Sequence, residues 1–445
     1  MLMLAFAFAV MGDPVSSVAY AIEAALRALD GRLGLLLPTM ALVVAIIALV
    51  IVNYHRLVAR FPGGGDAAAA GTAFGEGWAF LPLGSLIVDY ALTIAISCSA
   101  ATSAIVAYVP SVASARLPVA VALCTLVAGL TWFGHGGRTL FAAMTVSFVC
   151  IGSLVILWGL VGPHGHGHAR LDPPSATGSA PLAVLLAFPV AMALATGVEA
   201  PSSAVAQLGQ LDRAGKVRFG QITLWLTLGI VAWLTIGLTA LAVRLHVGIP
   251  PGDSTQIAEI ARAAVGDGPL FAAFQLTSAV LLLAAASSSF QAGPGLLKAL
   301  ARGRGGEGIL PASLGRTNAH HTPYWSVGVF LAVSCAVILA GGGREQELVL
   351  FYAVAVFVSF VFGLLSMSRF SRREGRWLLL AVNLVSLAAV ALTLAVNLRR
   401  GYPLASLAAA GITAGGLFAL WDRAGRPGGV SEAERRSEEE LATLT

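Results

Sequence analysis

Three acidic residues lie inside long apolar stretches, where a charge is costly. They are Asp13, Asp89 and Glu199. A charged side chain at the centre of a bilayer costs about 2.5 to 3.5 kcal/mol, so such residues face the protein interior and bind or relay ions. In predicted helices, Asp89 and Thr93 are one turn apart, as are Thr196 and Glu199. Carboxylate and hydroxyl oxygens suit a hard cation, so this pattern predicts a cation site.

Two tyrosines and a second role for Glu199 extend this hypothesis. Tyr20 and Tyr352 add phenolic oxygens in two further apolar stretches. A carboxyl group partly withdrawn from water can load and release a proton near neutral pH. Glu199 is therefore also a candidate proton carrier that would couple transport to a proton gradient.

The elements that must position these residues are membrane-spanning helices. Hydrophobic residues make up 57% of the 445 and charged residues 11%, and the mean hydropathy is +0.84, which excludes a water-soluble globule. The small, dispersed excess of basic residues does not indicate a nucleic-acid partner. Twelve spans are predicted, near 2–27, 34–55, 76–109, 116–134, 139–162, 182–206, 221–245, 269–300, 324–341, 347–369, 376–398 and 402–421.

The first and sixth spans are predicted to be broken helices. Gly12, Asp13 and Pro14 interrupt the first, and residues 196–203, with Gly197 and Pro201, interrupt the sixth. Freed backbone groups survive at membrane depth only where they are buried in protein or line a cavity. Matched breaks five spans apart predict an inverted-repeat transporter with its site between the halves.

The predicted spans divide the chain into four segments. The expected repeats are residues 1–162 (spans one to five) and 182–369 (spans six to ten), followed by two helices at 376–421 and a short charged tail at 422–445, expected to be disordered or helical. With an even number of spans, both ends of the chain lie on the same side of the membrane. Eighteen of the 27 Lys and Arg residues then fall on that side. The positive-inside rule then places both termini in the cytoplasm, and the Ala-, Gly- and Arg-rich composition suggests a bacterial plasma membrane.

The sequence offers no catalytic or cofactor motif in a convincing context. The four cysteines lie in apolar runs without metal-ligand spacing, and no nucleotide-binding or nucleophile motif is present. We therefore expect neither an enzyme nor a resident cofactor, and no metal other than a transported cation.

The motifs resemble those of the amino acid-polyamine-organocation superfamily, whose members have the LeuT-like fold of five plus five helices. The resemblance covers essentially the whole chain. It rests on Gly-Asp-Pro-Val-Ser-Ser-Val-Ala-Tyr-Ala-Ile-Glu at 12–23, Phe-Pro-Gly-Gly-Gly at 61–65, Leu-Ile-Val-Asp-Tyr-Ala-Leu-Thr at 86–93, Ala-Thr-Gly-Val-Glu-Ala at 195–200, Ser-Ser-Ser-Phe-Gln at 287–291, Gly-Ile-Leu-Pro at 308–311 and Phe-Tyr-Ala-Val-Ala-Val-Phe-Val-Ser-Phe at 351–360.

Within that superfamily the sequence resembles in particular the KUP-type proton-coupled potassium importers and their KimA-like bacterial branch. The resemblance implies potassium uptake driven by inward proton movement. The cation-site pattern of that family falls on Asp13, Tyr20, Asp89, Tyr90, Thr93, Thr196 and Tyr352, with Glu199 as the proton carrier. We expect no counterpart of the family's large cytoplasmic C-terminal region, so the regulation and dimerisation attributed to that region do not transfer.

The alternative within the same fold is a proton- or cation-coupled permease for amino acids or amines. In such permeases the first break offers free helix N-H groups to a substrate carboxylate. Here Asp13 stands in that break, and its carboxylate would repel a substrate carboxylate while attracting a cation. The sequence therefore favours an inorganic cation or an amine over an anionic group, and leaves the two cationic classes open.

Overall fold

The computed structural model describes residues 2–133, 138–162, 179–303, 308–399 and 403–443. Within these ranges the chain is helical, with no β-strand assigned. The first half contains α1 (Leu2–Ser16), α2 (Val18–Ala28), α3 (Leu33–Arg60), α4 (Gly65–Phe74), α5 (Phe80–Tyr108), α6 (Arg116–Trp132) and α7 (Arg138–Val161). The second half contains α8 (Ala180–Ala191), α9 (Ala200–Ala204), α10 (Arg213–Arg244), α11 (Gln256–Val265), α12 (Pro269–Arg302), α13 (Tyr324–Ala340), α14 (Glu345–Arg373), α15 (Trp377–Leu398), α16 (Pro403–Arg423) and α17 (Ala433–Thr443).

The long helices confirm the prediction of an all-helical polytopic membrane protein. In the described part of the chain, eleven helical segments are long and apolar enough to cross a membrane, and the 17-residue α13 is a shorter apolar helix. They correspond to the twelve predicted spans. The largest difference is α10, which begins eight residues before the predicted start because Asp212 caps it by accepting a hydrogen bond from the Gly215 N-H at 2.8 Å.

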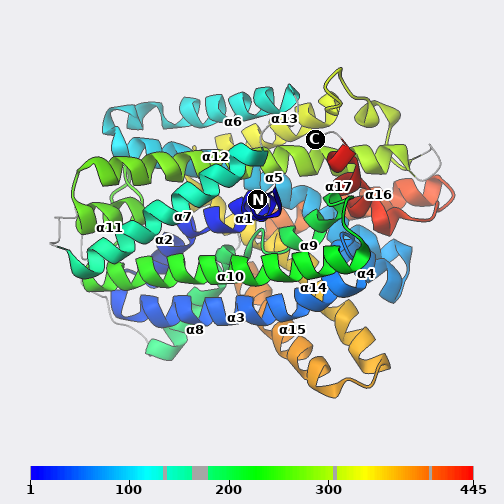
Figure 1. Cartoon of the computed structure of the whole chain (residues 1–445), viewed down its shortest axis with the longest axis horizontal. Helices are drawn as coiled ribbons and strands as arrows, with labels where there is room; N and C mark the ends of the chain where they lie inside the picture. The colour runs from blue at the N-terminus through cyan, green and yellow to red at the C-terminus, as the bar shows by residue number, and fades with distance from the viewer. Residues whose placement is uncertain (1, 134–137, 163–178, 304–307, 400–402, 444–445) are drawn as a thin grey trace.

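Central and peripheral helices differ in how much of their surface is covered. In the most apolar 18-residue stretch within Glu76–Tyr108, 78% of the residues are buried. In the corresponding stretch of α15, 22% are buried. Figure 1 shows the long helices running side by side, with α1 and α5 in the interior and α3, α6 and α15 at the periphery. Four of the residues predicted to bind the cargo are therefore carried by interior helices: Asp13 by α1, and Asp89, Tyr90 and Thr93 by α5.

Small residues allow the central helix α5 to pack closely against its neighbours. It contacts α12, α14 and α16 over much of its length. At Gly84, an added Cβ atom would lie 2.6 Å from the backbone nitrogen of Ala414 in α16. Because lipid-embedded helices associate mainly through van der Waals packing, this close backbone approach stabilises the bundle.

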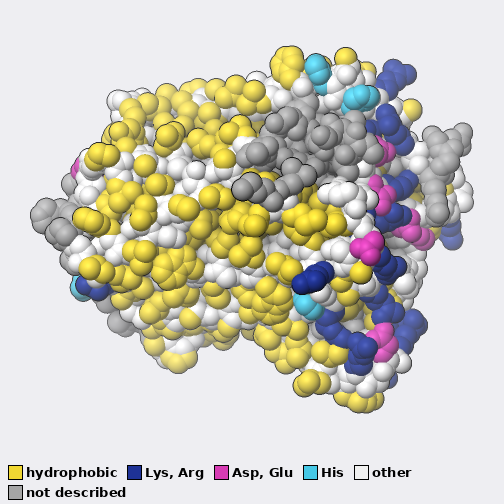
Figure 2. Space-filling view, viewed as in Figure 1, with side chains coloured by type: hydrophobic (Ala, Val, Ile, Leu, Met, Phe, Trp, Pro, Cys, Tyr) yellow, Lys and Arg dark blue, Asp and Glu magenta, His cyan; other side chains and the backbone are white. Residues whose placement is uncertain are grey.

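Basic side chains gather at one end of the bundle. Figure 2 shows them, mixed with a few acidic side chains, at the end where Figure 1 places α4, α16 and α17, while the flank of the molecule is mostly hydrophobic. This apolar flank bounded by a charged end is the surface expected of a helical bundle in a bilayer.

Candidate functional site

The backbone interruptions in the first and sixth spans lie against each other. The first span consists of α1 and α2, which are separated at Ser17. In the sixth span, α8 is followed by a 3-10 turn at Met192–Ala195, a non-helical stretch, and then the short α9. Pro201 occupies the first turn of α9, where its missing N-H is not needed. Gly197 adopts a left-handed φ of +78° between the two helical parts.

The first interruption lies downstream of the predicted position. Gly12 and Pro14 both lie inside α1, and the helix continues to Ser16. Proline removes a single intrahelical hydrogen bond and can be accommodated when neighbouring side chains satisfy the local backbone. Here the Ser16 hydroxyl donates to the Asp13 carbonyl oxygen at 2.7 Å. The prediction of a break at Gly12 and Pro14 therefore needs correction to Ser17.

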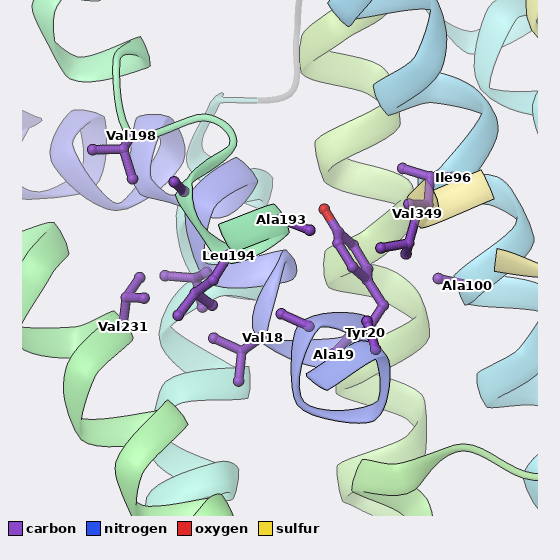
Figure 3. Packing of buried hydrophobic residues seen from close by; sticks show 14 of the residues in the cluster. Val18, Ala19, Tyr20, Ile96, Ala100, Ala193, Leu194, Val198, Val231 and Val349 are labelled. Carbon is purple, nitrogen blue, oxygen red and sulfur yellow. The ribbon is translucent and has the colours of Figure 1, made fainter. Parts of the chain in front are cut away.

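A buried cluster of three hydroxyl groups joins the two interrupted spans. Ser17 Oγ lies 2.8 Å from Tyr20 Oη and 2.9 Å from Thr196 Oγ1, and the Tyr20 and Thr196 oxygens are 3.5 Å apart. Thr196 also donates to the Ala193 carbonyl oxygen at 2.7 Å. Figure 3 shows the Tyr20 ring between Ala193 on one side and Ile96 and Val349 on the other. Three hydroxyl oxygens are thus held together in an otherwise apolar core.

Gly197 brings the second interruption against Asp13. A Cβ atom at Gly197 would lie 2.9 Å from both Cγ and Oδ2 of Asp13 and 3.0 Å from the Pro14 nitrogen. Only a residue without a side chain allows this approach at the observed positive φ. The backbone of the sixth span therefore forms part of the immediate surroundings of the Asp13 carboxylate.

A cavity of about 110 Å³ lies beside these interruptions. Asp13, Tyr90 and Glu199 contribute to its wall. Its other polar lining residues are Ser203, Gln207, Ser288, Ser289, Gln291 and Glu438. A cavity of this size accommodates a small ion together with a few water molecules.

Each of the three acids predicted at membrane depth has one buried carboxylate oxygen without a hydrogen-bond partner among the described residues. These oxygens are Oδ1 of Asp13, Oδ1 of Asp89 and Oε2 of Glu199. The Asp89 carboxylate is within electrostatic reach of both others. Buried carboxylates close to one another cannot all be ionised without a compensating cation or proton. The arrangement therefore suits exchange of protons and cations.

The predicted residues fall into two adjoining groups. Asp13, Tyr90 and Glu199 line the cavity, whereas Tyr20 and Thr196 belong to the hydroxyl cluster. The two groups are linked through the chain from residue 196 to residue 199. Asp89 and Thr93 are buried in α5, 3% and 1% exposed, but are not part of the cavity wall. Tyr352 belongs to α14, and its side chain lies outside the part that the structure describes.

Several polar contributors were not predicted from the sequence, among them Ser17 and Glu438. Ser17 bridges Tyr20 and Thr196, and the serine pair in the first span was a signal that a donor lies there. Glu438 reaches the cavity from the C-terminal helix α17. No local pattern distinguishes it from the neighbouring glutamates of the charged tail.

A second buried carboxylate site lies at the basic end of the bundle. Asp66, in the first turn of α4, accepts hydrogen bonds at Oδ2 from the Tyr54 hydroxyl at 2.6 Å and the Ser359 hydroxyl at 3.0 Å. Burial raises the pKa of Asp66 to about 7, against the lowering effect of these hydrogen bonds. Burial and the nearby Asp66 charge raise the pKa of Glu434 to about 8.

The pKa of Asp66 predicts a pH-dependent stability. Its folded-state pKa of about 7 lies above its ordinary 3.8, so between these values the folded protein holds the proton more tightly than the unfolded chain. The free energy of unfolding should therefore fall as pH rises from about 4 to 7, by at most about 1.4 kcal/mol per pH unit from this group. Asp66→Asn should reduce the loss of melting temperature between pH 5 and pH 8. Asp253→Asn, at an exposed loop position, should leave it unchanged; equal pH dependence in both variants would contradict the assignment.

A larger charged cavity occupies the opposite end. It has a volume of about 420 Å³, and Glu23, Arg27, Arg116 and Glu345 are among its lining residues. Glu23 and Arg27 form a salt bridge at 2.8 Å, and the Ser103 hydroxyl donates to Glu345. Both cavities are lined by carboxylate side chains.

Comparison with known proteins identifies the family. The family model described as amino acid permease matches residues 3–412. Potassium transporter KimA of Bacillus subtilis (strain 168) is 28% identical over 362 residues, which cover 78% of this chain and 58% of that protein. The chain therefore matches a little over half of the length of this relative. With a family match across nearly all its spans, the chain belongs to the amino acid permease family of the amino acid-polyamine-organocation superfamily, as a multi-pass membrane transporter.

Proposed function

We propose that the chain is a secondary active transporter that takes up potassium together with protons by alternating access. The observation that carries the proposal is the Asp13 carboxylate, which faces the cavity at the junction of the two broken helices and is packed against Gly197. A fixed carboxylate there attracts a cation. The similarity to a protein named as a potassium transporter points to the same cargo.

In this proposal Asp13 and the hydroxyl groups of Tyr20 and Thr196 replace water around the cation. Oxygen ligands of this kind match a hard monovalent ion, and backbone carbonyls freed at the interruptions complete its coordination. Asp89, Tyr90, Thr93 and Tyr352 form the remainder of the proposed site. Since Thr196 Oγ1 and Ser17 Oγ are already 2.9 Å apart, small shifts of the two breaks would alter the donor set.

Glu199 is the proposed proton carrier. It lines the same cavity as Asp13, and its Oε2 atom is buried without a partner among the described residues. We propose that its carboxyl group takes up a proton when the pathway opens to the outside and releases it when the pathway opens to the cytoplasm. Because a proton on Glu199 changes the charge beside the cation site, the two movements become coupled.

The second candidate is a permease for an amine or an amino acid. The description of the matching family as amino acid permease favours it, and the polar cavity wall offers hydrogen-bond partners to an ammonium group. In that case Asp13 would bind the substrate ammonium group. The two candidates share fold and pathway and differ in the cargo.

Uptake into proteoliposomes distinguishes the candidates. Rubidium, as a potassium surrogate, should accumulate under an imposed inward proton gradient, and this uptake should disappear when the gradient is collapsed or in Asp13→Asn. Asp253→Asn, an exposed carboxylate, is the matched control. Uptake from a labelled amino-acid and amine mixture without rubidium uptake would reject potassium and establish the permease.

We also propose that both termini are cytoplasmic and that the membrane is the plasma membrane of a bacterium. The basic side chains collected at the end that carries α4, α16 and α17 support this orientation. A green fluorescent protein fused after Thr445 should be fluorescent in a bacterial host, whereas alkaline phosphatase at the same position should be inactive. Active phosphatase would reverse the orientation.

A further inference from the structure

The C-terminal helix α17 is polar yet packs into the end of the bundle. Its sequence, with four glutamates and two arginines between Ala433 and Thr443, is typical of a solvated tail. Nevertheless Glu434, Ser437 and Glu438 are at most 7% exposed. The helix contacts α4, α9, α12 and the 3-10 turn Val205–Gln207. Figure 1 shows it folded back against the bundle at the same end as α4 and α16.

Three polar contacts, called anchors below, hold the C-terminal segment in place. This segment consists of the 3-10 turn Val430–Glu432 and α17. Glu76 accepts hydrogen bonds from the Ser431 N-H at 2.9 Å and the Ser431 hydroxyl at 3.0 Å. Lys298 of α12 forms a salt bridge with Glu440 at 2.8 Å. Gln207 donates its side-chain amide to Glu438. These contacts join the segment to three different elements of the transporter.

Three glycines provide the space into which the segment fits. A Cβ atom at Gly65 would lie 2.4 Å from Glu434 Oε2, and one at Gly71 would lie 2.4 Å from Ser431 Cβ. At Gly295 it would lie 2.6 Å from Ser437 Oγ. Real Cβ contacts are not this short, so a side chain at Gly71 would push against Ser431, and one at Gly65 or Gly295 would require the side-chain tip of Glu434 or Ser437 to turn away. The transporter surface is therefore complementary to the C-terminal helix.

The helix also contributes to the cavity that holds the candidate site. Glu438 forms part of the same wall as Asp13 and Glu199, with its partner Gln207 beside it. Ser203, another residue of this wall, interacts with Glu434. The helix thus covers the cavity at the basic end of the bundle.

From this placement we propose that α17 is a plug that closes the cavity at the basic end and must move away for cargo to leave on that side. The inference rests on the proposed transport function. The anchors are polar groups that water can also satisfy, and the ion pair among them, Lys298–Glu440, is partly exposed at Glu440, where such pairs contribute only about 0 to 1 kcal/mol. The helix can therefore exchange its contacts for water without unfolding the membrane bundle.

A disulfide staple tests whether the helix must move. The Cβ atoms of Gly295→Cys and Ser437→Cys would lie 4.0 Å apart, within the range of disulfides. In a background with the four native cysteines replaced by alanine, oxidation of the double variant should lower uptake of the cargo at least tenfold, and reduction should restore it. Each single variant under the same oxidant is the control. Complete cross-linking with unchanged uptake would overturn the proposal.

A cysteine-accessibility measurement tests the plug without any knowledge of the cargo. Ser288, on the cavity wall, becomes the reporter as Ser288→Cys, treated with a charged thiol reagent from the basic side in the same background. Removing residues 430–445 should increase its labelling rate at least tenfold. A reporter at the exposed Arg372 should react equally with and without the segment. Unchanged labelling of Ser288→Cys would overturn the plug, whatever the transported cargo proves to be.

A charge-swap pair avoids dependence on the truncated chain. Lys298→Glu removes the salt bridge to Glu440 and should raise the labelling rate of Ser288→Cys severalfold. The double variant with Glu440→Lys restores opposite charges and should return the rate to the original value. If rubidium is not taken up but the labelling rates change as expected, potassium is rejected as the cargo and the plug is retained. If rubidium is taken up but the labelling rate is the same in all variants, the plug is rejected and potassium is retained.

Discussion

Glu199→Gln is expected to abolish proton-driven accumulation of rubidium while leaving rubidium exchange intact. Glutamine keeps the size and polarity of the side chain but cannot carry a proton. Accumulation requires Glu199 to release its proton on one side, whereas exchange of bound rubidium across the membrane requires only that the loaded site alternates. We expect at least a hundredfold loss of gradient-driven uptake, equivalent to about 2.7 kcal/mol, and less than a threefold change in exchange.

The comparison of the two assays separates coupling from structure. A variant that merely misfolds would lose accumulation and exchange together. Asp13→Asn should lose both even when folded, since the cation itself would lack its carboxylate. Glu199→Gln with undiminished gradient-driven uptake would show that another group carries the proton.

Hydropathy and the two interrupted spans were enough to predict the fold. Each apolar stretch must form a helix because only internal hydrogen bonding satisfies a backbone in lipid. The acids at positions 13 and 199 were also informative, because a carboxylate at membrane depth is retained only where it faces a polar interior. Both line one cavity, together with Tyr90.

The break in the first span could not be placed from local sequence. Gly12 and Pro14 are the strongest helix breakers in that stretch, yet the helix passes through both and separates at Ser17. What decides the position is tertiary, namely the Ser17 hydroxyl paired with Thr196 from a span almost 180 residues away. The pattern of residues along one helix does not indicate such a distant partner.

Helical structure in the C-terminal tail was one of two expectations, but its docking against the bundle could not be predicted, for the same reason. Its composition matches a solvated tail, and only the glycines at positions 65, 71 and 295 show where it packs. These glycines look unremarkable in the sequence because two belong to a Gly- and Ala-rich stretch and one lies beside a proline. A docking surface formed by glycines can be recognised only once the three-dimensional arrangement of distant elements is known.

The chemistry of the cavity restricts the range of possible cargoes more than the fold does. The carboxylates of Asp13 and Glu199 face one small space, and Asp89 lies within electrostatic reach. Such a space disfavours any anionic group and stabilises a cation or an ammonium group. The cavity volume of about 110 Å³ fits an inorganic ion with a few water molecules or a small amine, and disfavours a bulky amino acid.

Gly197→Ala should be among the most damaging single substitutions in the chain. Its φ of +78° costs a residue with a Cβ atom about 1 to 2 kcal/mol, and that atom would lie 2.9 Å from the Asp13 carboxylate. Either Asp13 or the sixth-span interruption must move, so the donor atoms around the cation would separate.

We expect uptake in Gly197→Ala to fall at least a hundredfold while the purified protein remains monodisperse in detergent, because the surrounding helices are unaffected. Two glycine controls separate the causes. Gly75→Ala imposes at least as much backbone strain, at φ +110° and ψ +155°, with open space around the new atom, and Gly229→Ala adds a methyl group in open space within helix α10. Both should retain most of the uptake. If Gly75→Ala were as damaging as Gly197→Ala, general backbone strain would explain the loss; if Gly197→Ala retained uptake, the close contact with Asp13 would have no part in transport.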